Sequence, residues 1–423
     1  MATYQHSPSP VFQTFFRPAL DSFSESFSRY DCHQLPDEDF LEAGIQRCLS
    51  SSRTGRDFLQ RHADSCRKTG SVDLHFKALQ SKRRLTNITS VNRGLAATLS
   101  KSIEDPFKAN PELNDFAIYA GDGHYHSPAA HDSKQLDSGG TMRREAVGHF
   151  FLLNLRTHFL SHLTGADQSG KRKREHDMRA IKRVAIDELR GAEPKGTKVI
   201  LAWDKAGIDF TFWRKAKMSS GLYFISREKS NMKLTRCGNR PYEKADVRNG
   251  GIISDENVGP GGSGGMLFRR ITYRDPVEEK TYVYLTTEMT LPPGLLVLIY
   301  KQRWDIEKVF DELKSKLEEK KAWASKPTAK AMQAQFLCLT HNLMMLIEER
   351  LIREEGIDNH RERKRKKKRV QQVKESGENY IATALQRFTV RSLKFIRWLR
   401  NFVYNEAHWS VAVARLRQVY EDF

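Results

Sequence analysis

Hydrophobic positions along the chain follow two different spacings, and the change from one to the other divides it into parts. From Asp37 onward, apolar residues recur three and four positions apart, which is the spacing of amphipathic helices. Short continuous apolar runs begin at Phe116 and alternate with further stretches of helical spacing. The pattern therefore predicts a helical N-terminal part followed by a core of alternating strands and helices.

Within the core, four apolar runs have the length of buried strands. They cover residues 116–120, 147–155, 198–203 and 222–226. Helical spacing between them predicts helices at 178–189 and 210–217.

The pattern changes again between residues 226 and 290. Short alternating segments separated by turn residues predict strands near 251–254, 266–273 and 281–286. Helical spacing then returns, with helices expected at 300–314, 331–351, 381–388 and 390–403. We therefore expect an α/β core that is interrupted by a β-rich insertion and completed by a helix near residue 300.

This division gives five parts. They are a mobile N-terminus with a helical domain, which its basic cluster at residues 82–84 predicts to bind DNA (1–110), the first part of the core (111–225), the β-rich insertion (226–292), the completing helix of the core (293–350), and a basic loop with a helical C-terminal region (351–423).

Charge narrows the choice of partner. The 423 residues include 71 Lys and Arg against 52 Asp and Glu, a formal net charge of +19. Such a charge favours a polyanionic partner, nucleic acid first and an anionic membrane surface second. The sequence opens on polar residues, and the apolar stretch 336–347 is too short to span a bilayer. We expect a soluble, intracellular protein without a membrane partner.

Two basic clusters are candidate DNA contacts. Lys82, Arg83 and Arg84 lie on a helix expected from Leu74 onward, and they either contact DNA or only solvate a helix end. Residues 360–369 contain an almost unbroken run of Lys and Arg. Such a run repels itself, so we expect an exposed loop. It either holds a phosphate backbone, which we favour, or resembles a nuclear-import signal by accident.

The stretch from Tyr300 to Lys314 combines four polar residue types on one side of a helix. With Arg303 set at zero on a helical projection, Glu307 lies near 40°, Lys314 near 20° and Tyr300 near 60°. The apolar residues of this helix occupy a separate arc, from about 240° to about 340°. They are Ile306, Val309, Phe310, Leu313 and Leu317. That arc can pack on a sheet and leave the polar stripe along the rim of the buried face.

This stripe has a structural interpretation and a functional one. Arg303 and Glu307 four positions apart form an ordinary helix pair, which contributes only about 0.2–0.5 kcal/mol. Alternatively, the carboxylate holds a metal ion while the cations and the phenol hold phosphate.

The spacing Tyr-x2-Arg-x3-Glu-x6-Lys also resembles the Tyr-Arg-Glu-Lys signature of bacterial insertion-sequence DDE transposases, the insertion-sequence-4 type. The resemblance implies that Glu307 is the third catalytic carboxylate. It also requires two aspartates upstream, each at the end of a buried strand.

Asp122 and Asp204 each follow an expected strand and meet this requirement. They are far from Glu307 in sequence, so only a sheet can bring the three carboxylates together. Clustered carboxylates repel unless cations neutralise them, and their hard oxygen atoms suit Mg²⁺ or Mn²⁺. Two such ions can activate a water and stabilise the leaving oxygen of a phosphodiester. Taken alone, however, an aspartate at the end of a strand is often only a turn residue.

The resemblance covers most of residues 75–350, including Gly121-Asp-Gly123 and Trp203-Asp-Lys-Ala-Gly207. It implies a ribonuclease-H-like mixed-sheet core, metal-dependent DNA cleavage and transfer into target DNA, and phosphate contacts by Tyr300, Arg303 and Lys314. It further implies a homodimer on the element's terminal inverted repeats, in a bacterial cytoplasm. Tyr282, in the insertion, either stacks on a flipped base or packs as a half-buried strand residue.

Two other functions fit the same residues. A ribonuclease-H-like nuclease or resolvase would keep the carboxylates and cut without joining strands. A non-catalytic basic DNA-binding protein would keep the charge and need no metal.

Overall fold

The computed structural model describes most of the chain outside the N-terminus. The described residues are 35–51, 54–62, 72–136, 140–167, 175–260, 267–317, 321–357, 379–385, 391–404 and 408–421, with the single positions 367, 368, 371 and 375. The expected mobile N-terminus, most of the basic run at 360–369 and the Gly-rich stretch at 261–265 lie outside them.

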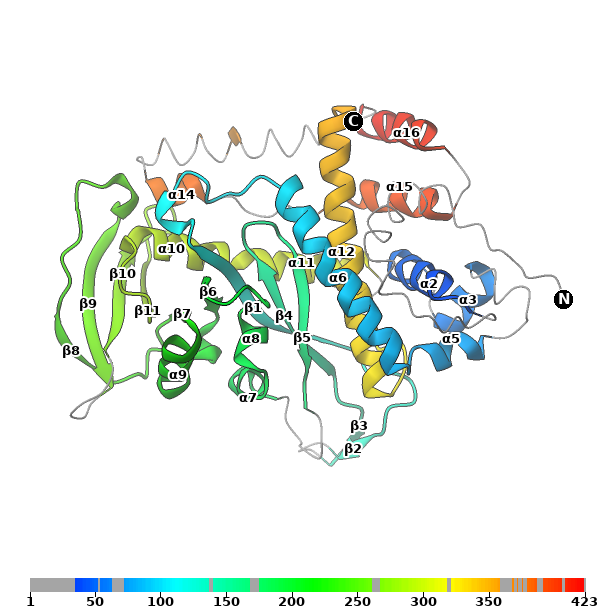
Figure 1. The fold of residues 1–423 in the computed structure, drawn as a ribbon, viewed down its shortest axis with the longest axis horizontal. Coiled ribbons are helices and arrows are strands. Elements are labelled where there is room, and N and C mark those ends of the chain that lie inside the picture. Colours follow the sequence, from blue (N-terminus) through cyan, green and yellow to red (C-terminus); the bar gives the residue numbers. More distant parts are fainter. Residues whose placement is uncertain are drawn as a thin grey trace.

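Nine strands of the described chain form one mixed sheet in the order β5-β4-β1-β6-β7-β11-β10-β9-β8 (Figure 1). The core strands are β1 (Phe116–His126), β4 (Val147–Asn154), β5 (Leu160–Gly165), β6 (Lys198–Trp203) and β7 (Leu222–Arg227). β1 and β5 run antiparallel to β4, while β6 runs parallel to both β1 and β7. This order and these directions confirm the expected ribonuclease-H-like core.

The strands of the insertion extend the same sheet. They are β8 (Leu234–Asn239), β9 (Ile252–Pro260), β10 (Phe268–Arg274) and β11 (Thr281–Thr286). β11 pairs antiparallel with β7, and β10, β9 and β8 follow in turn. The short alternating pattern thus gives an extension of the core sheet. A separate two-stranded hairpin, β2 (Gln135–Leu136) with β3 (Met142–Arg143), lies between β1 and β4 in the chain.

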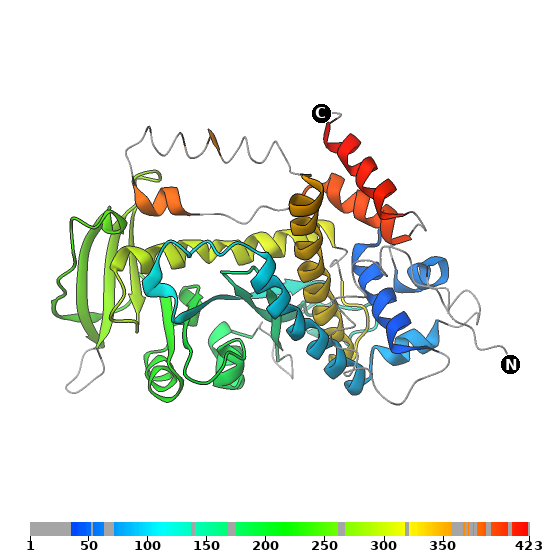
Figure 2. The ribbon, with the colours of Figure 1, turned by 45° about the horizontal axis from the view of Figure 1, so that its top comes forward.

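Helices cover both faces of the sheet (Figures 1 and 2). On one face lie α6 (Lys82–Ser102), α10 (Pro293–Gln302), α11 (Trp304–Lys316) and α12 (Pro327–Glu355). On the other lie α7 (Asp177–Arg183), α8 (Ile186–Leu189) and α9 (Phe210–Ser220). The remaining elements are α2 (Asp37–Leu49), α3 (Gly55–His62), α5 (Asp73–Ala78), α14 (Tyr380–Ala384), α15 (Leu393–Tyr404), α16 (Trp409–Glu421), η3 (Pro111–Leu113), η4 (Lys205–Gly207) and η5 (Val247–Asn249).

Three expected helices are divided in the structure. The helix expected from Leu74 ends at Ala78, and α6 begins after Ser81, whose side chain accepts a hydrogen bond from the Arg84 amide. The helix expected at 178–189 divides into α7 and α8. The helix expected at 300–314 is formed by α10 and α11, which meet at Arg303. Hydrophobic spacing alone continues across these short interruptions and does not locate them.

Alternation along the strands decides which side chains face α10–α12. Ile118 and Ala120 of β1 pack in the core cluster with those helices, whereas Tyr119 packs in the cluster on the α7–α9 side. Ile200 and Ala202 of β6 also face α10–α12. Side chains two positions apart share a face, so the next even positions, 122 and 204, project toward α11.

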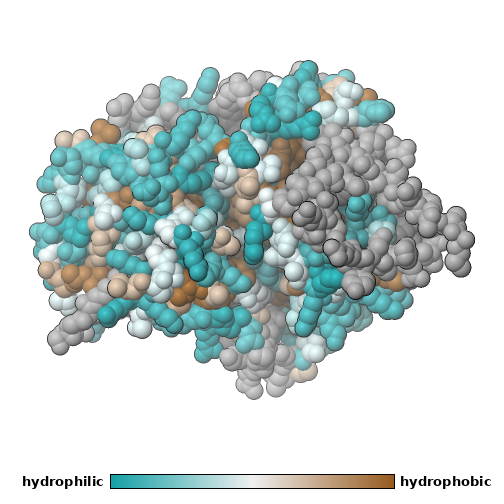
Figure 3. Space-filling model, viewed as in Figure 1, coloured by the Kyte–Doolittle hydropathy of each residue, from teal (hydrophilic) through white to brown (hydrophobic). Residues whose placement is uncertain are grey.

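The surface gives no sign of a membrane span. In the described part of the chain, no helix is both long and apolar enough to cross a bilayer. Hydrophilic residues cover most of the face in Figure 3, and hydrophobic ones gather only in small patches.

The C-terminal region is fastened to α11 by a buried ion pair. Glu312 accepts hydrogen bonds from the backbone amide of Arg391, at 3.0 Å, and from its guanidinium group, and both side chains are fully buried. The Arg391 Nε atom lies 2.8 Å from an oxygen of Glu348 on α12. Burial alone would raise the pKa of Glu312, but the charge of Arg391 and a hydrogen bond from His341 outweigh it and lower the pKa to about 2.

This pair predicts a stability loss in acid. The folded-state pKa of Glu312 lies below its ordinary value of 4.5, so its contribution is complete above about pH 5 and disappears as the pH falls toward about 2. Glu312→Gln should therefore cost on the order of 3 kcal/mol of unfolding free energy at pH 7 and much less near pH 3. Denaturant unfolding of both proteins across this range measures the difference. A difference that does not change with pH would contradict the assignment.

Candidate active site

Asp122 and Asp204 lie side by side on the sheet. In the β1–β6 ladder the last pair is Gly121 opposite Trp203, so each aspartate comes directly after a paired residue. Asp204 follows β6, and its carboxylate accepts a hydrogen bond of 2.7 Å from the Ala206 amide at the start of η4.

The expectation that β1 ends at Asp122 is wrong. β1 continues to His126 because its pairing with β4 extends beyond the end of β6, with Asp122 opposite Phe151. The apolar run ends near residue 120 because glycine and histidine follow it, and these residues continue the strand without adding to the hydrophobic signal. Asp122 therefore lies at the end of the β1–β6 pairing, within β1.

Gly121 keeps this part of the sheet closely packed. A Cβ atom there would lie 2.0 Å from the ring of Trp203. The Trp203 indole in turn donates a 3.0 Å hydrogen bond to Asp177 on α7. The tryptophan thereby fills the face opposite the two aspartates, so only glycine fits beside it.

α11 packs over β1 through the predicted apolar arc. All five members of the arc are buried: Ile306, Val309, Phe310, Leu313 and Leu317. The Phe310 ring stacks on that of His124, two positions beyond Asp122 on the same face of β1, with centroids 4.7 Å apart. This packing sets the polar stripe of α11 beside the aspartates.

Arg303 connects the sheet with the polar stripe of α11. Its Nη1 atom lies 3.4 Å from an oxygen of Asp122, and its Nη2 atom donates a 2.7 Å hydrogen bond to Glu307. Only 8% of the Arg303 side chain is exposed. A buried guanidinium group therefore occupies the space between these two carboxylates.

The electrostatics of the site favour added positive charge. Burial raises the pKa of Asp122 to about 7, and the negative charge of Asp204 contributes, although Arg303 and the Gly123 amide oppose the shift. Burial also raises the pKa of Asp177, again with a contribution from Asp204. Negative charges thus oppose one another at the site, although Arg303 lies among them.

The three carboxylates can be compared with what a divalent metal ion requires of its ligands. Carboxylate oxygens of Asp122, Asp204 and Glu307 are ligands that Mg²⁺ prefers, and Asp122 and Asp204 adjoin each other. Across the described residues, however, no three His, Cys, Asp or Glu side chains are grouped closely enough to hold an ion. The ligand chemistry fits, and Arg303 takes the place of a cation between Asp122 and Glu307.

The structure gathers three of the four residues of the stripe. The Arg303 guanidinium lies 5.6 Å from the centre of the Tyr300 ring, which itself packs 4.9 Å from the ring of Tyr284. Lys314 is exposed on α11. Tyr282 is half-buried, bonds through its hydroxyl to Glu278, and lies under the guanidinium of Arg227 at 4.7 Å.

The N-terminal basic cluster is partly internal. Arg84 is buried, with Nε 3.1 Å from Asp37 and Nη2 donating to the Leu35 carbonyl at 2.7 Å. Arg83 also pairs with Asp37, at 3.0 Å, whereas Lys82 is exposed. Arg83 and Arg84 thus fasten the first turn of α2 to α6, and a DNA contact by the cluster stays a prediction.

Asp177 is a neighbour of the site that the sequence did not reveal. It lies at the start of α7, on the face of the sheet opposite α11, and is connected to the site through Trp203. Nothing in the local sequence distinguishes it from an ordinary acidic residue in the first turn of a helix.

A family model described as the transposase DDE domain matches residues 118–343, more than half of the chain. The chain belongs to this family of transposases. The matched range begins in β1 and ends in α12, so it contains both aspartates and Glu307.

Solved structures add little to this. A piggyBac transposase synaptic complex with hairpin DNA is similar over 97% of this chain and 82% of that one, at 10% identity. Its TM-score of 0.36 is too low to support a conclusion. No curated protein matches.

The raised pKa of Asp122 predicts a stability effect in metal-free buffer. Because the folded state binds the proton more tightly than the unfolded state, ionisation of Asp122 destabilises the parent as the pH rises from about 4 through about 7. Asp122→Asn should therefore be more stable than the parent at pH 8, by on the order of 2–4 kcal/mol, and nearly equal at pH 4. Chemical denaturation with a chelator present measures this, and equal stabilities at pH 8 would count against it.

Proposed function

We propose that this protein cuts DNA at the ends of a mobile element and joins those ends to target DNA, as a transposase of the insertion-sequence-4 type. The observation that carries the proposal is the contact of Arg303 with both Asp122 and Glu307. It joins the sheet to the helix that bears the Tyr-Arg-Glu-Lys spacing, inside the range matched by the family model.

Asp122, Asp204 and Glu307 would hold divalent metal ions, either Mg²⁺ or Mn²⁺. We propose two ions rather than one. When bound, such ions supply an activated water and stabilise the leaving oxygen of the phosphodiester. The three side chains contribute the negative charge that binds the ions. The raised pKa of Asp122 agrees with this role, because a cation close to a carboxylate lowers its pKa and keeps it ionised.

Arg303 would hold the phosphate next to the scissile bond. Its guanidinium group presents a planar fork of donors that matches two phosphate oxygens. Tyr300 lies beneath this fork, and burial raises its pKa, so the phenol remains protonated and can donate a hydrogen bond. Exposed Lys314 adds a point charge farther along α11.

The partner in this proposal is double-stranded DNA, both the terminal inverted repeats and the target. The net charge of +19 supports a polyanionic partner. Lys82, Arg83, Arg84 and Tyr282 are further proposed contacts, and the protein would act as a homodimer on DNA in the bacterial cytoplasm. A nuclease of the same fold would cut and not join, so strand joining is the reaction that separates the two functions.

Removing single carboxylates tests the proposal. Asp122→Asn, Asp204→Asn and Glu307→Gln should abolish Mg²⁺-dependent cleavage of end DNA, because the amide keeps the shape and loses the charge. Each variant should still fold, and end binding should change little. Asp311→Asn is the matched control, an exposed acid on the same helix. Single-turnover cleavage and strand joining are measured on gels, and near-parental cutting by Glu307→Gln would falsify the assignment.

The roles of the cations can be separated in a salt series. Arg303→Lys keeps the charge but loses the fork, so it should bind end DNA and cut slowly. Lys314→Ala should weaken end binding and lower the slope of log K against log salt by about one unit. The measurements are end-DNA affinity at several salt concentrations and single-turnover cleavage at saturating Mg²⁺. If both variants match the parent, the stripe is only a solvated helix face.

A further inference from the structure

A turn at residues 287–292 connects β11 of the insertion to α10. α10 ends at Arg303, where α11 with Glu307 begins. We propose that Arg269, on β10 of the insertion, is a positioning residue that fixes the start of α10 and thereby sets the placement of Arg303 and Glu307. Its effect on cleavage rests on the proposed function, whereas its effect on α10 does not.

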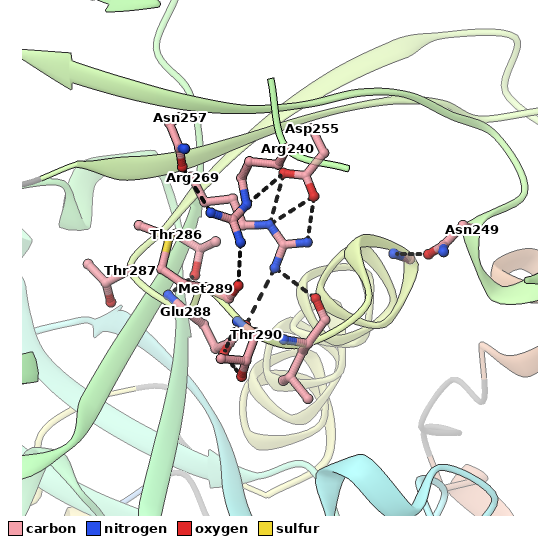
Figure 4. Close-up of polar contacts among 12 residues, drawn as sticks. Arg240, Asn249, Asp255, Asn257, Arg269, Thr286, Thr287, Glu288, Met289 and Thr290 are labelled. Carbon is pink, nitrogen blue, oxygen red and sulfur yellow. Dashed lines mark hydrogen bonds and ion pairs between the residues drawn. The ribbon is translucent and has the colours of Figure 1, made fainter. Parts of the chain in front are cut away.

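Arg269 lies beside this turn, among the polar groups that hold it (Figure 4). Its Nε and Nη2 atoms bond to the two oxygens of Asp255 on β9, at 2.9 and 2.6 Å. Its Nη1 atom donates a 2.7 Å hydrogen bond to the carbonyl of Leu291, directly before the prolines that begin α10. The Arg269 side chain is 3% exposed and that of Asp255 1%. The fork therefore fixes the turn to β9 from inside the protein.

Glu288 fixes the same turn from its other end. Its carboxylate accepts hydrogen bonds from the amides of Thr290, at 2.7 Å, and Leu291, at 2.9 Å. One of its oxygens lies 3.6 Å from Nη1 of Arg269. The Glu288 amide donates a 3.0 Å hydrogen bond to the hydroxyl of Thr286. Each step of the turn is thus held by a directional bond.

Arg240 completes the charge balance. It donates to the carbonyl of Met289 and, at 2.9 Å, to the side chain of Asn257, and its Nε atom lies 3.6 Å from Asp255. Two guanidinium groups therefore face the two buried carboxylates of Asp255 and Glu288. Compensation of this kind is required because an unpaired buried charge is strongly destabilising.

The first turn of α10 is also held from η5. The amide of Gly294 donates a 3.0 Å hydrogen bond to the side chain of Asn249. A Cβ atom at position 294 would lie 1.7 Å from the carbonyl oxygen of Arg248. The helix start is thus pressed against η5 on one side and tied to Arg269 on the other.

A displacement at this start would reach the active site through the helix. α10 is ten residues long, buried over most of its length and packed on β6 and β7. At about 1.5 Å per residue, it behaves as a rigid rod of roughly 15 Å. Because Arg303 is both the end of α10 and the beginning of α11, a shift at Leu291 moves the arginine relative to Asp122 on the sheet.

Stability alone does not explain the buried charges of Arg240, Asp255, Arg269 and Glu288. A well-packed apolar group of similar volume would serve as well or better for stability. An apolar side chain cannot, however, hold Asp255 and the Leu291 carbonyl at fixed angles at the same time. The buried charges therefore add directional bonds at the start of α10, the helix that leads to Arg303 and Glu307.

Arg269→Lys tests the inference, because lysine keeps the charge and loses the fork. Arg270→Lys is the matched control. Arg270 is the next residue on β10, faces the other side of the sheet, and bonds to Glu228 at 2.8 Å. Hydrogen exchange followed by mass spectrometry should show faster exchange at residues 288–303 in Arg269→Lys and not in Arg270→Lys. Single-turnover cleavage should fall about tenfold to a hundredfold, with end-DNA affinity close to that of the parent.

Asn249→Ala is a second variant, in case Arg269→Lys does not fold, because it removes the hydrogen bond to the Gly294 amide of the same helix, together with one to the Glu243 carbonyl. Like Arg269→Lys, it should speed hydrogen exchange at residues 288–303 and slow cleavage. Unchanged exchange at 288–303, or parental cleavage despite faster exchange, would overturn the inference. Equal loss of protection over the whole molecule would also overturn it, since Arg269 would then be merely structural. A parent that never cuts DNA refutes the proposed function, and the exchange measurement still decides whether Arg269 positions α10.

Discussion

Like charges gathered on a buried face repel, and the arrangement of this protein follows from the need to offset that repulsion. Alternation along β1 and β6 sets Asp122 and Asp204 on the face that α11 covers. The same packing leaves Asp122 only partly exposed, and its partial burial raises its pKa to about 7. Arg303 supplies one positive charge inside the protein, between Asp122 and Glu307.

The two helices α10 and α11 meet at Arg303, the residue that carries this positive charge. Buried ion pairs anchor the two helices at both ends. At the start of α10, Arg269 and Asp255 belong to the insertion. Near the end of α11, Glu312 bonds to Arg391 of the C-terminal region. Both partners lie outside the core strands that carry the aspartates. The insertion and the C-terminal region therefore both contact the two helices that carry the polar stripe.

Much of the architecture could be predicted from the sequence, because buried strands and amphipathic helices each have a characteristic spacing of apolar residues. The apolar arc of α11 and the strands β6 and β7 follow directly from this. What could not be read depends on pairing or on single hydrogen bonds. β1 continues past Asp122 because β4 lies beside it, and no residue within β1 encodes that partner. The buried contacts of Arg84 and Arg269 depend on chain segments distant in sequence, so local pattern shows them only as basic residues.

The continuous sheet has a consequence for how the chain is made. β7, the last strand of the core, obtains its outer neighbour only from β11, at residues Thr281–Thr286. While the intervening residues are being synthesised, the edge of β7 exposes unpaired backbone groups that can pair with other chains. Glu307 lies later still, so it is synthesised after the strand that closes that edge. During translation, therefore, the sheet can be complete before all three carboxylates are present, and a chain released early would carry an open edge and no assembled active site.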